Sequence, residues 1–361
     1  MDYSIRSSIE DRNEWYDKSF KNIITFRSER KLDNLDIEIT PIAVDHSVPG
    51  SYGFLIDLKD YRIIYTGDFR WHGPARKLTS NFIDKIKSFD ANLIICEGTQ
   101  FSNINSLSEI DVENEASQLI SLSKGLILVN ISPLDIDRIY TFYKVAEKCN
   151  RQLVLNIKLA AILARLNKFE IQNYPDLKKL NVLYIERKRL MKWKKSFLAG
   201  IRNEKFGSKL SEREYSLGKN YKGLINVEEL IRNSSEYILI TSYYSYDELA
   251  ELYRFSRGSL KLRDKVRGGI YIMSTSEPFE EEMEVKFEKL KNWIKIAGFI
   301  YYPIHSSGHI RPLDLKRFLS IINVKNIIPV HTDAPYYFEN FIRDLNYNII
   351  HPVKGETLTL N

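Results

Sequence analysis

Short apolar runs alternate along most of the chain with longer segments in which apolar residues recur at helical spacing. The short runs predict buried strands, and the longer segments predict amphipathic helices. Predicted strands cover residues 22–26, 35–40, 39–44, 52–58, 62–66, 91–96, 125–132, 153–155, 237–241 and 326–330. Predicted helices cover 82–89, 108–123 and 136–146, and two more follow Pro278 and Pro312. The repeated strand, helix, strand order indicates a layered α/β fold.

The stretch 45–73 combines two predicted strands with polar residues at their ends. His46 follows the apolar run 39–44, and a second run further on ends at Gly67 and Asp68. An imidazole and a carboxylate therefore leave neighbouring strands at the same rim of a sheet. Both side chains bind zinc through nitrogen or oxygen. Without further signals, a loop cap explains His46 and a turn explains Asp68 better than metal binding does.

Three further motifs follow in a fixed order. The chain contains LIICEGT with Glu97, then HSSGH at 305–309, then PVHTDAP at 329–335 with His331. With the separation of 22 residues between His46 and Asp68, this set resembles the metallo-β-lactamase fold hydrolases of the β-CASP branch. STSEPF, followed by an acidic helix, resembles the archaeal-type ribonuclease J group in particular.

The resemblance implies an αββα sandwich, here N-terminally incomplete, that carries an inserted α/β β-CASP domain. The first part of the sandwich would comprise residues 1–102. The inserted domain would comprise 103–298, and the C-terminal part of the sandwich would comprise 299–361.

The resemblance also implies zinc-dependent hydrolysis of phosphodiester bonds in RNA, with two zinc ions that neutralise charge on the phosphate. His46 would bind one ion, His331 the other, and Asp68 both. His309 would stabilise the phosphate or protonate the leaving oxygen, which suits an imidazole near neutral pH. Glu97 would orient His309. The residues expected to hold phosphate or RNA are Ser306, Ser307, Gly308, Arg70, His72 and Ser276.

The chain departs from the family pattern at its beginning. The HxHxDH motif supplies further metal ligands in the family, yet residues 1–45 contain no histidine. We therefore expect that Met1 is a late start, and that HxHxDH comes from an N-terminal partner chain or is absent. Alone, the chain would bind zinc weakly and be weakly active or inactive. The first sheet would then expose an apolar face or an open edge.

Charge suggests an anionic partner. The net charge is +6, and residues 185–222 contain twelve Lys or Arg against four Glu, with aromatic residues between them. Basic side chains on phosphates with aromatic faces for bases are typical of proteins that hold single-stranded nucleic acid. A solvated helical face is the alternative explanation of this segment.

The cysteines and the hydropathy of the chain indicate in which cellular compartment the protein is expected. Cys96 and Cys149 lie in apolar surroundings and form neither a disulfide framework nor a CxxC pair. No run approaches the length of a membrane span. We therefore expect a cytoplasmic protein that does not enter a membrane. The sequence leaves open whether the chain forms a homodimer.

Three functional hypotheses remain. The first is a β-CASP ribonuclease, and the second is a catalytically silent protein that binds RNA as a scaffold. The third is a small-molecule metallo-hydrolase, because related folds also cleave thioesters and lactones. The long insert and HSSGH favour the first hypothesis over the third.

Overall fold

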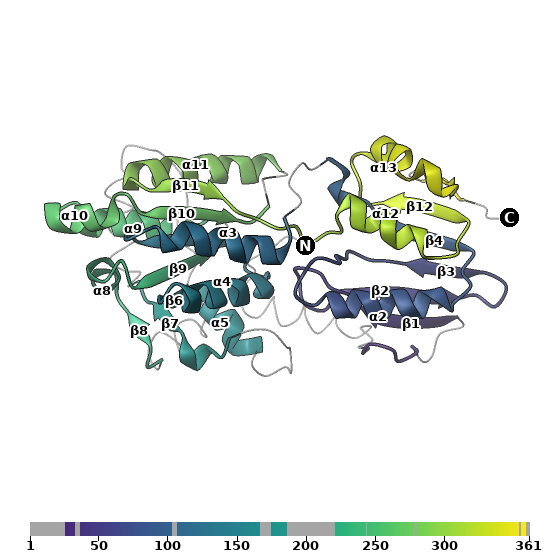
Figure 1. Cartoon of the computed structure of the whole chain (residues 1–361), viewed down its shortest axis with the longest axis horizontal. Helices are drawn as coiled ribbons and strands as arrows, with labels where there is room; N and C mark the ends of the chain where they lie inside the picture. Colours follow the sequence, from purple (N-terminus) through teal and green to yellow (C-terminus); the bar gives the residue numbers. More distant parts are fainter. Residues whose placement is uncertain are drawn as a thin grey trace, which may run out of the picture.

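The computed structural model of the chain describes residues 26–32, 37–102, 107–166, 175–185, 221–242, 244–276, 278, 280–353 and 355–358. Two β-sheets, each covered by helices, lie side by side in this part of the chain (Figure 1). We call the unit around the six-stranded sheet the first lobe and the unit around the seven-stranded sheet the second lobe. The predicted mixed α/β class is confirmed.

The first lobe combines an antiparallel meander with parallel strands. Its strand order is β1-β2-β3-β4-β12-β13, in which β1 to β3 are antiparallel and β3, β4, β12 and β13 are parallel. The strands are β1 Glu38–Ala43, β2 Tyr52–Asp57, β3 Arg62–Tyr65, β4 Leu93–Glu97, β12 Asn326–Val330 and β13 Asn348–Ile349. The helices are α2 Arg76–Lys87, α12 Pro312–Ser320 and α13 Pro335–Ile342, with the short 3-10 turns η1 Thr99–Ser102 and η3 Arg343–Leu345.

The two faces of this sheet differ in how well they are covered. On β2 and β3, Leu55 and Ile64 pack with Phe82 of α2 in the core of the lobe. The alternate residues Phe54 and Tyr65 lie opposite each other on the other face and remain partly exposed, Tyr65 to 38%. Phe26 packs edge-on against Phe54 and so covers part of this face.

The expectation of an open edge is only partly met. Glu29 and Leu32 donate backbone hydrogen bonds to the carbonyls of Pro41 and Ile39 on β1. Residues 26–32 therefore occupy part of the edge of β1, which an unpaired strand would otherwise present to solvent.

The second lobe is a parallel sheet with helices on both faces. Its strand order is β11-β10-β5-β9-β6-β7-β8. The strands are β5 Ile127–Ile131, β6 Gln152–Asn156, β7 Asn181–Leu183, β8 Leu224–Ile225, β9 Tyr237–Ser242, β10 Ile270–Ser274 and β11 Ile300–Pro303. Nearly continuous apolar sequence in β5, β9 and β10 accounts for their complete burial, as expected for central parallel strands.

Two separate cores lie on the two faces of the second sheet. One core contains side chains of α3 Glu109–Ser121, α4 Ile136–Lys148 and α5 Ile157–Leu166, next to the 3-10 turn η2 Leu177–Lys179. The other contains side chains of α8 Val227–Arg232, α9 Asp247–Ser256, α10 Leu260–Val266 and α11 Glu281–Ala297. This is the doubly wound arrangement that the alternating pattern predicted.

The return of the chain to the first lobe differs from our expectation. We placed the boundary between residues 298 and 299, but β11 pairs in parallel with β10 of the second sheet. The second sheet therefore extends to Pro303. Residues 304–311, which we call the crossing segment, then connect β11 to α12 in the first lobe.

Within the described ranges, no helix combines the length and the apolar character needed to span a membrane.

Candidate functional site

Five polar residues from distant parts of the chain meet at one rim of the first sheet. Four of them lie at or just after the ends of β1, β3, β4 and β12. These four strands run in the same direction, because β1 and β3 are both antiparallel to β2, and β4 and β12 are parallel to β3. Such strands end at a common edge. The crossing segment contributes the fifth residue. These residues are His46, Asp68, Glu97, His309 and His331.

Three imidazole rings form a row at this rim. The ring centroids of His46 and His309 are 5.0 Å apart, and those of His309 and His331 are 5.1 Å apart. His331 Nδ1 lies 2.9 Å from a carboxylate oxygen of Asp68. The structure therefore brings together the histidines that the sequence separates by up to 285 positions.

Hydrogen bonds define the orientation of two of these rings. His46 Nδ1 lies 2.6 Å from the Gly308 carbonyl, which can only accept, so His46 carries its proton on Nδ1. His309 Nδ1 lies 3.1 Å from Glu97. Neither Nε2 atom has a hydrogen-bond partner among the described residues. A histidine whose Nδ1 is held by a carbonyl or a carboxylate is oriented to bind a metal through Nε2.

Glu97 is buried, and its oxygens already accept several hydrogen bonds. They accept from the Phe69 amide at 2.9 Å and from the Thr99 hydroxyl at 2.8 Å, as well as from His309. These donors hold the carboxylate in one orientation. Glu97 therefore suits a positioning role for His309 better than direct metal binding.

Thr99 is a site residue that the sequence reasoning missed. Its hydroxyl lies within hydrogen-bond distance of Glu97, of the His309 ring and of the His331 carbonyl. It therefore links the carboxylate to both neighbouring histidines. A hydroxyl two positions after a strand-ending Glu was the available signal, because such side chains often bond locally at strand ends.

The pKa values of His46 and His309 shift in opposite directions. Burial lowers the pKa of His46, so its ring is neutral at neutral pH. Burial alone would also lower the pKa of His309, but the hydrogen bond and charge of Glu97 raise it above its ordinary value. Glu97 thus favours the protonated form of His309, whereas burial favours the neutral form of His46.

The donor set fits a metal ion. The ligand atoms of His46, Asp68 and His309 all lie within 4.8 Å of one another, and so do those of Glu97, His309 and His331. Two imidazole nitrogens and one carboxylate oxygen could together hold one metal ion. The first group fits better because the oxygens of Glu97 are already engaged. Two of the three expected ligands, His46 and Asp68, belong to this group. The third, His331, lies outside the group and contacts Asp68.

Backbone conformation also marks the rim. His331 has a φ of 50° directly after β12, a left-handed conformation that is uncommon for residues other than glycine. Its side chain is 53% exposed. Such local strain is concentrated at functional sites.

Three consecutive carbonyls of the crossing segment point toward side chains behind the rim. Arg138 donates to the Ser306 carbonyl at 2.9 Å, and His72 to the Ser307 carbonyl at 3.2 Å. The Gly308 carbonyl accepts from His46. Among the described residues, the amides of Ser307 and Gly308 have no hydrogen-bond acceptor, and Gly308 is buried.

Some residues expected to contact phosphate or RNA are buried instead. Arg70 is fully buried and paired with Asp45 at 2.9 Å and Asp137 at 2.7 Å. The side chains of His72 and Ser306 are also buried. This burial does not fit direct contact with a ligand, because a guanidinium enclosed by two carboxylates is already neutralised.

The remaining expected RNA contacts lie away from the rim or outside the described residues. Ser276 is exposed after β10 in the second lobe, and its carbonyl accepts from Tyr244. Residues 186–220 of the basic segment lie outside the described part. Of its aromatic residues, Tyr221 is described, and its hydroxyl donates to the Leu180 carbonyl at 2.7 Å within the lobe.

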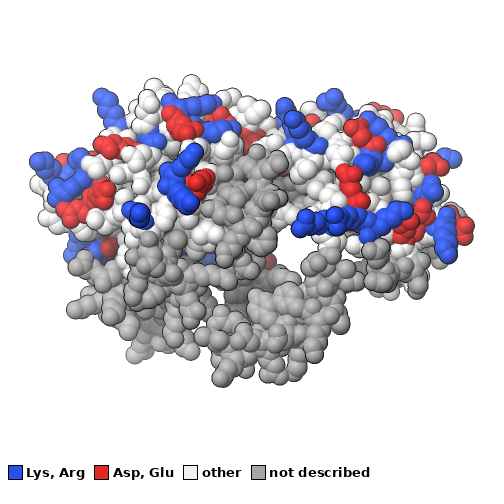
Figure 2. Space-filling model, turned by 90° about the horizontal axis from the view of Figure 1, so that it is seen from below, with Lys and Arg blue, Asp and Glu red and all other residues white. Residues whose placement is uncertain are grey.

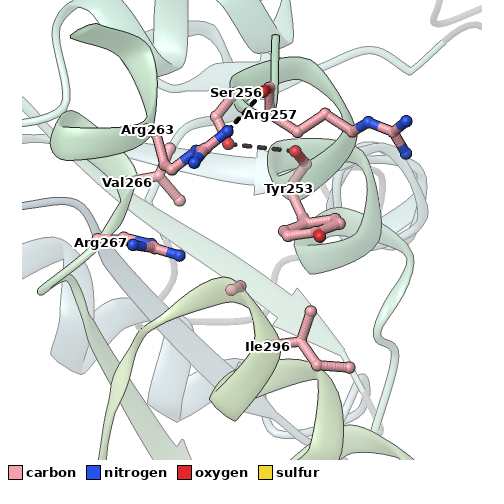
Figure 3. Close-up of a pocket in the computed structure, with 8 residues that line it drawn as sticks. Tyr253, Ser256, Arg257, Arg263, Val266, Arg267 and Ile296 are labelled. Carbon is pink, nitrogen blue, oxygen red and sulfur yellow. Dashed lines mark hydrogen bonds between the residues drawn. The ribbon is translucent and has the colours of Figure 1, made fainter. Parts of the chain in front are cut away.

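Surface charge and a hollow in the second lobe are two further features of the molecule. On the face in Figure 2, basic and acidic residues are interspersed over the described parts of both lobes. A hollow of about 110 Å³ lies among α9, α10 and α11, on the side of the second lobe away from the rim (Figures 1 and 3). Its lining includes Tyr253, Arg257, Arg263, Arg267 and Ile296.

Comparisons with known proteins show a distant likeness. No family model matches the chain. Ribonuclease J 2 of Streptococcus pyogenes serotype M3 is 25% identical over 142 residues, which covers 38% of this chain and 26% of that protein. The match thus spans about a quarter of that relative's length. A protein of unknown function from Enterococcus faecalis V583 shares the fold, with a TM-score of 0.66 and 22% identity over 94% of this chain and 67% of that chain.

Proposed function

We propose that this chain hydrolyses phosphodiester bonds in RNA at the rim formed by His46, Asp68, Glu97, His309 and His331. The observation that carries the proposal is the meeting of these five side chains, from five separate stretches of sequence, in one site. The partial likeness to a protein named Ribonuclease J 2 supports the same reaction class.

His46 and Asp68 would hold a zinc ion, together with a third ligand from His309 or His331. The donor set of imidazoles and a carboxylate suits zinc. When bound, zinc would activate water and stabilise negative charge on the phosphate. Proximity favours His309 as the third ligand, and the motif resemblance favours His331.

The remaining imidazole would transfer a proton or contact a phosphate oxygen. Glu97 and Thr99 hold His309 in place, and Asp68 lies beside His331. The amide N–H groups of Ser307 and Gly308 would donate hydrogen bonds to another phosphate oxygen. The roles are therefore divided among neighbouring groups at one rim, as general acid–base catalysis requires.

The test compares single variants for zinc content and for cleavage of a labelled single-stranded RNA. We expect H46A and D68N to lose both zinc and activity. If H309A loses zinc, His309 is the third ligand, and if H331A loses zinc, His331 is the third ligand. The variant that keeps zinc should lose activity by about 10²–10⁴-fold, which identifies the proton-transfer residue.

His351 supplies the matched control, because it is exposed, pairs with Glu339 and belongs to neither group of possible metal ligands. H351A should retain zinc and full activity. RNA cleavage that survives in D68N, or that is equally lost in H351A, would contradict the proposal.

A catalytically silent RNA-binding protein is the second candidate. The described residues supply only three ligands to each possible metal group, fewer than the four of a closed structural zinc site. RNA binding that weakens steeply with salt, in protein that contains no stoichiometric metal, would favour this candidate.

A further inference from the structure

We propose that Arg138 of α4 is a positioning residue that holds the crossing segment, and through it His309, against the second lobe. This inference rests on the proposed function only in its consequence for zinc. The crossing segment is where the chain leaves the second sheet and delivers His309 to the rim of the first sheet. Its conformation therefore decides where His309 lies relative to the other site residues.

Arg138 is fully buried, and all of its donor nitrogens are engaged. Nε and Nη2 donate to the two carboxylate oxygens of Glu109, at 2.7 and 3.0 Å. Nη1 donates to the carbonyl and hydroxyl of Ser274, at 3.0 and 2.6 Å, and lies 3.2 Å from His305 Nδ1. Nη2 also donates to the Ser306 carbonyl at 2.9 Å. One planar group thus joins α3, the end of β10 and the crossing segment.

Arg138 and Ser274 hold the beginning of the crossing segment, where the chain leaves the second lobe. Ser274 also donates its hydroxyl to the Ile304 carbonyl at 2.6 Å, so Arg138 and Ser274 together hold residues 304 to 306. His305 accepts from Arg138, and its pKa is lowered to about 3 by burial and by the charge of Arg138. The ring is therefore neutral and acts as a fixed acceptor.

The first lobe holds the next residues of the same segment. His72 donates to the Ser307 carbonyl and His46 to the Gly308 carbonyl, directly before His309. Carbonyls 306, 307 and 308 are thus held in turn by Arg138, then by two first-lobe histidines. Releasing the first contact frees the segment at the point where it enters the site.

A second buried arginine links the two lobes beside Arg138. Arg70 of the first lobe pairs with Asp137 of α4, and its Nη1 lies 3.9 Å from Glu109. Glu109 therefore lies between an arginine from each lobe. Because Arg70 keeps its contact with Asp137, loss of Arg138 should release the crossing segment without separating the lobes.

Arg138→Lys is the main test variant, because one ammonium cannot reproduce a planar fork that reaches four partner residues. Arg151→Lys is the matched control. Arg151 is also buried in the second lobe and donates to backbone carbonyls, those of Ser123 at 2.7 Å and Gly125 at 2.9 Å. It does not contact the crossing segment.

The first measurement is amide hydrogen–deuterium exchange by mass spectrometry on the full chain, for peptides that cover 304–311. We expect the exchange of the hydrogen-bonded amides of Ile304 and His309 to accelerate at least tenfold in R138K and to remain unchanged in R151K. Methylguanidinium should restore protection in R138A, because it returns the planar donor group. Circular dichroism shows whether each variant is folded. If R138K and R138A fail to fold, S274A provides the milder variant, with a smaller acceleration in the same peptides.

Unchanged exchange in R138K, or an equal rise in R151K, would overturn the proposal. Zinc affinity measured by chelator competition tests the consequence for His309, with an expected tenfold loss in R138K and none in R151K. If the unaltered chain binds no zinc, the proposed metal site fails, yet the exchange comparison still decides the role of Arg138.

Discussion

Gly308 shows how a single residue without a side chain shapes the rim. A Cβ atom at this position would lie 2.3 Å from Ser47 Oγ and 2.9 Å from a ring carbon of His46. Contacts this short require the neighbours to move. The close approach of the crossing segment to His46, and the hydrogen bond between them, therefore depend on glycine at 308.

Gly308→Ala should displace His46 and weaken zinc binding by tenfold or more, with a loss of about 1–3 kcal/mol of unfolding free energy. Zinc titration and urea unfolding measure the two effects. Gly258→Ala is the control, because a Cβ there meets nothing within 4 Å. Equal zinc affinity in G308A and the unaltered chain would contradict the close contact.

At the scale of elements, the starts of α3 and α4 concentrate buried charge between the lobes. Glu109 is the first residue of α3, where a negative charge faces the positive end of the helix dipole. Burial alone would raise the pKa of Glu109, but the charge and hydrogen bonds of Arg138 lower it to about 2. Glu109 is therefore ionised in the folded protein over the whole physiological range.

This lowered pKa predicts a pH-dependent contribution to stability. The unfolded chain has the ordinary value of 4.5, so the contribution is complete above that pH and is lost as pH falls toward 2. The unfolding free energies of the unaltered chain and Glu109→Gln should therefore differ most above pH 5. The difference should shrink by at most about 3 kcal/mol at lower pH.

Urea unfolding at a series of pH values measures this difference. Glu115→Gln changes an exposed residue of the same helix and should leave the profile as it is. A difference for E109Q that stays constant from pH 6 to pH 3 would show that Glu109 does not titrate as described.

At the scale of the whole molecule, the candidate site belongs to both lobes. The sheet of the first lobe provides four of the five rim residues, while the second lobe holds the segment that brings His309. A ligand that binds only the folded rim stabilises the fold in proportion to its concentration. Zinc should therefore raise the temperature at which the protein unfolds.

Zinc at about a hundred times its dissociation constant should add about 2.7 kcal/mol to the unfolding free energy. The corresponding rise in the unfolding temperature should reverse when EDTA removes the metal. His46→Ala should abolish the rise, whereas Asp60→Asn, in the exposed turn between β2 and β3, should preserve it. A rise that persists in H46A would place the bound zinc elsewhere.

The sequence alone determined many of the elements, such as β4, β5 and β12, and the positions of the polar residues at their ends. Apolar runs such as those of β4 and β12 are local signals, and a strand that ends in Glu97 or precedes His331 needs no partner to be recognised. The resemblance of these motifs, in this order, to a known family grouped the five rim residues before any contact was known.

Only the tertiary structure decided which polar side chains face the site. Arg70 is buried by Asp137, which lies 67 positions away, and the last strand of the second sheet is defined by its pairing with β10. Arg138 and Thr99 have no distinctive sequence pattern, because their roles arise from partners on other elements. Burial and pairing depend on which distant segments pack together, and local hydrophobic patterning does not encode that choice.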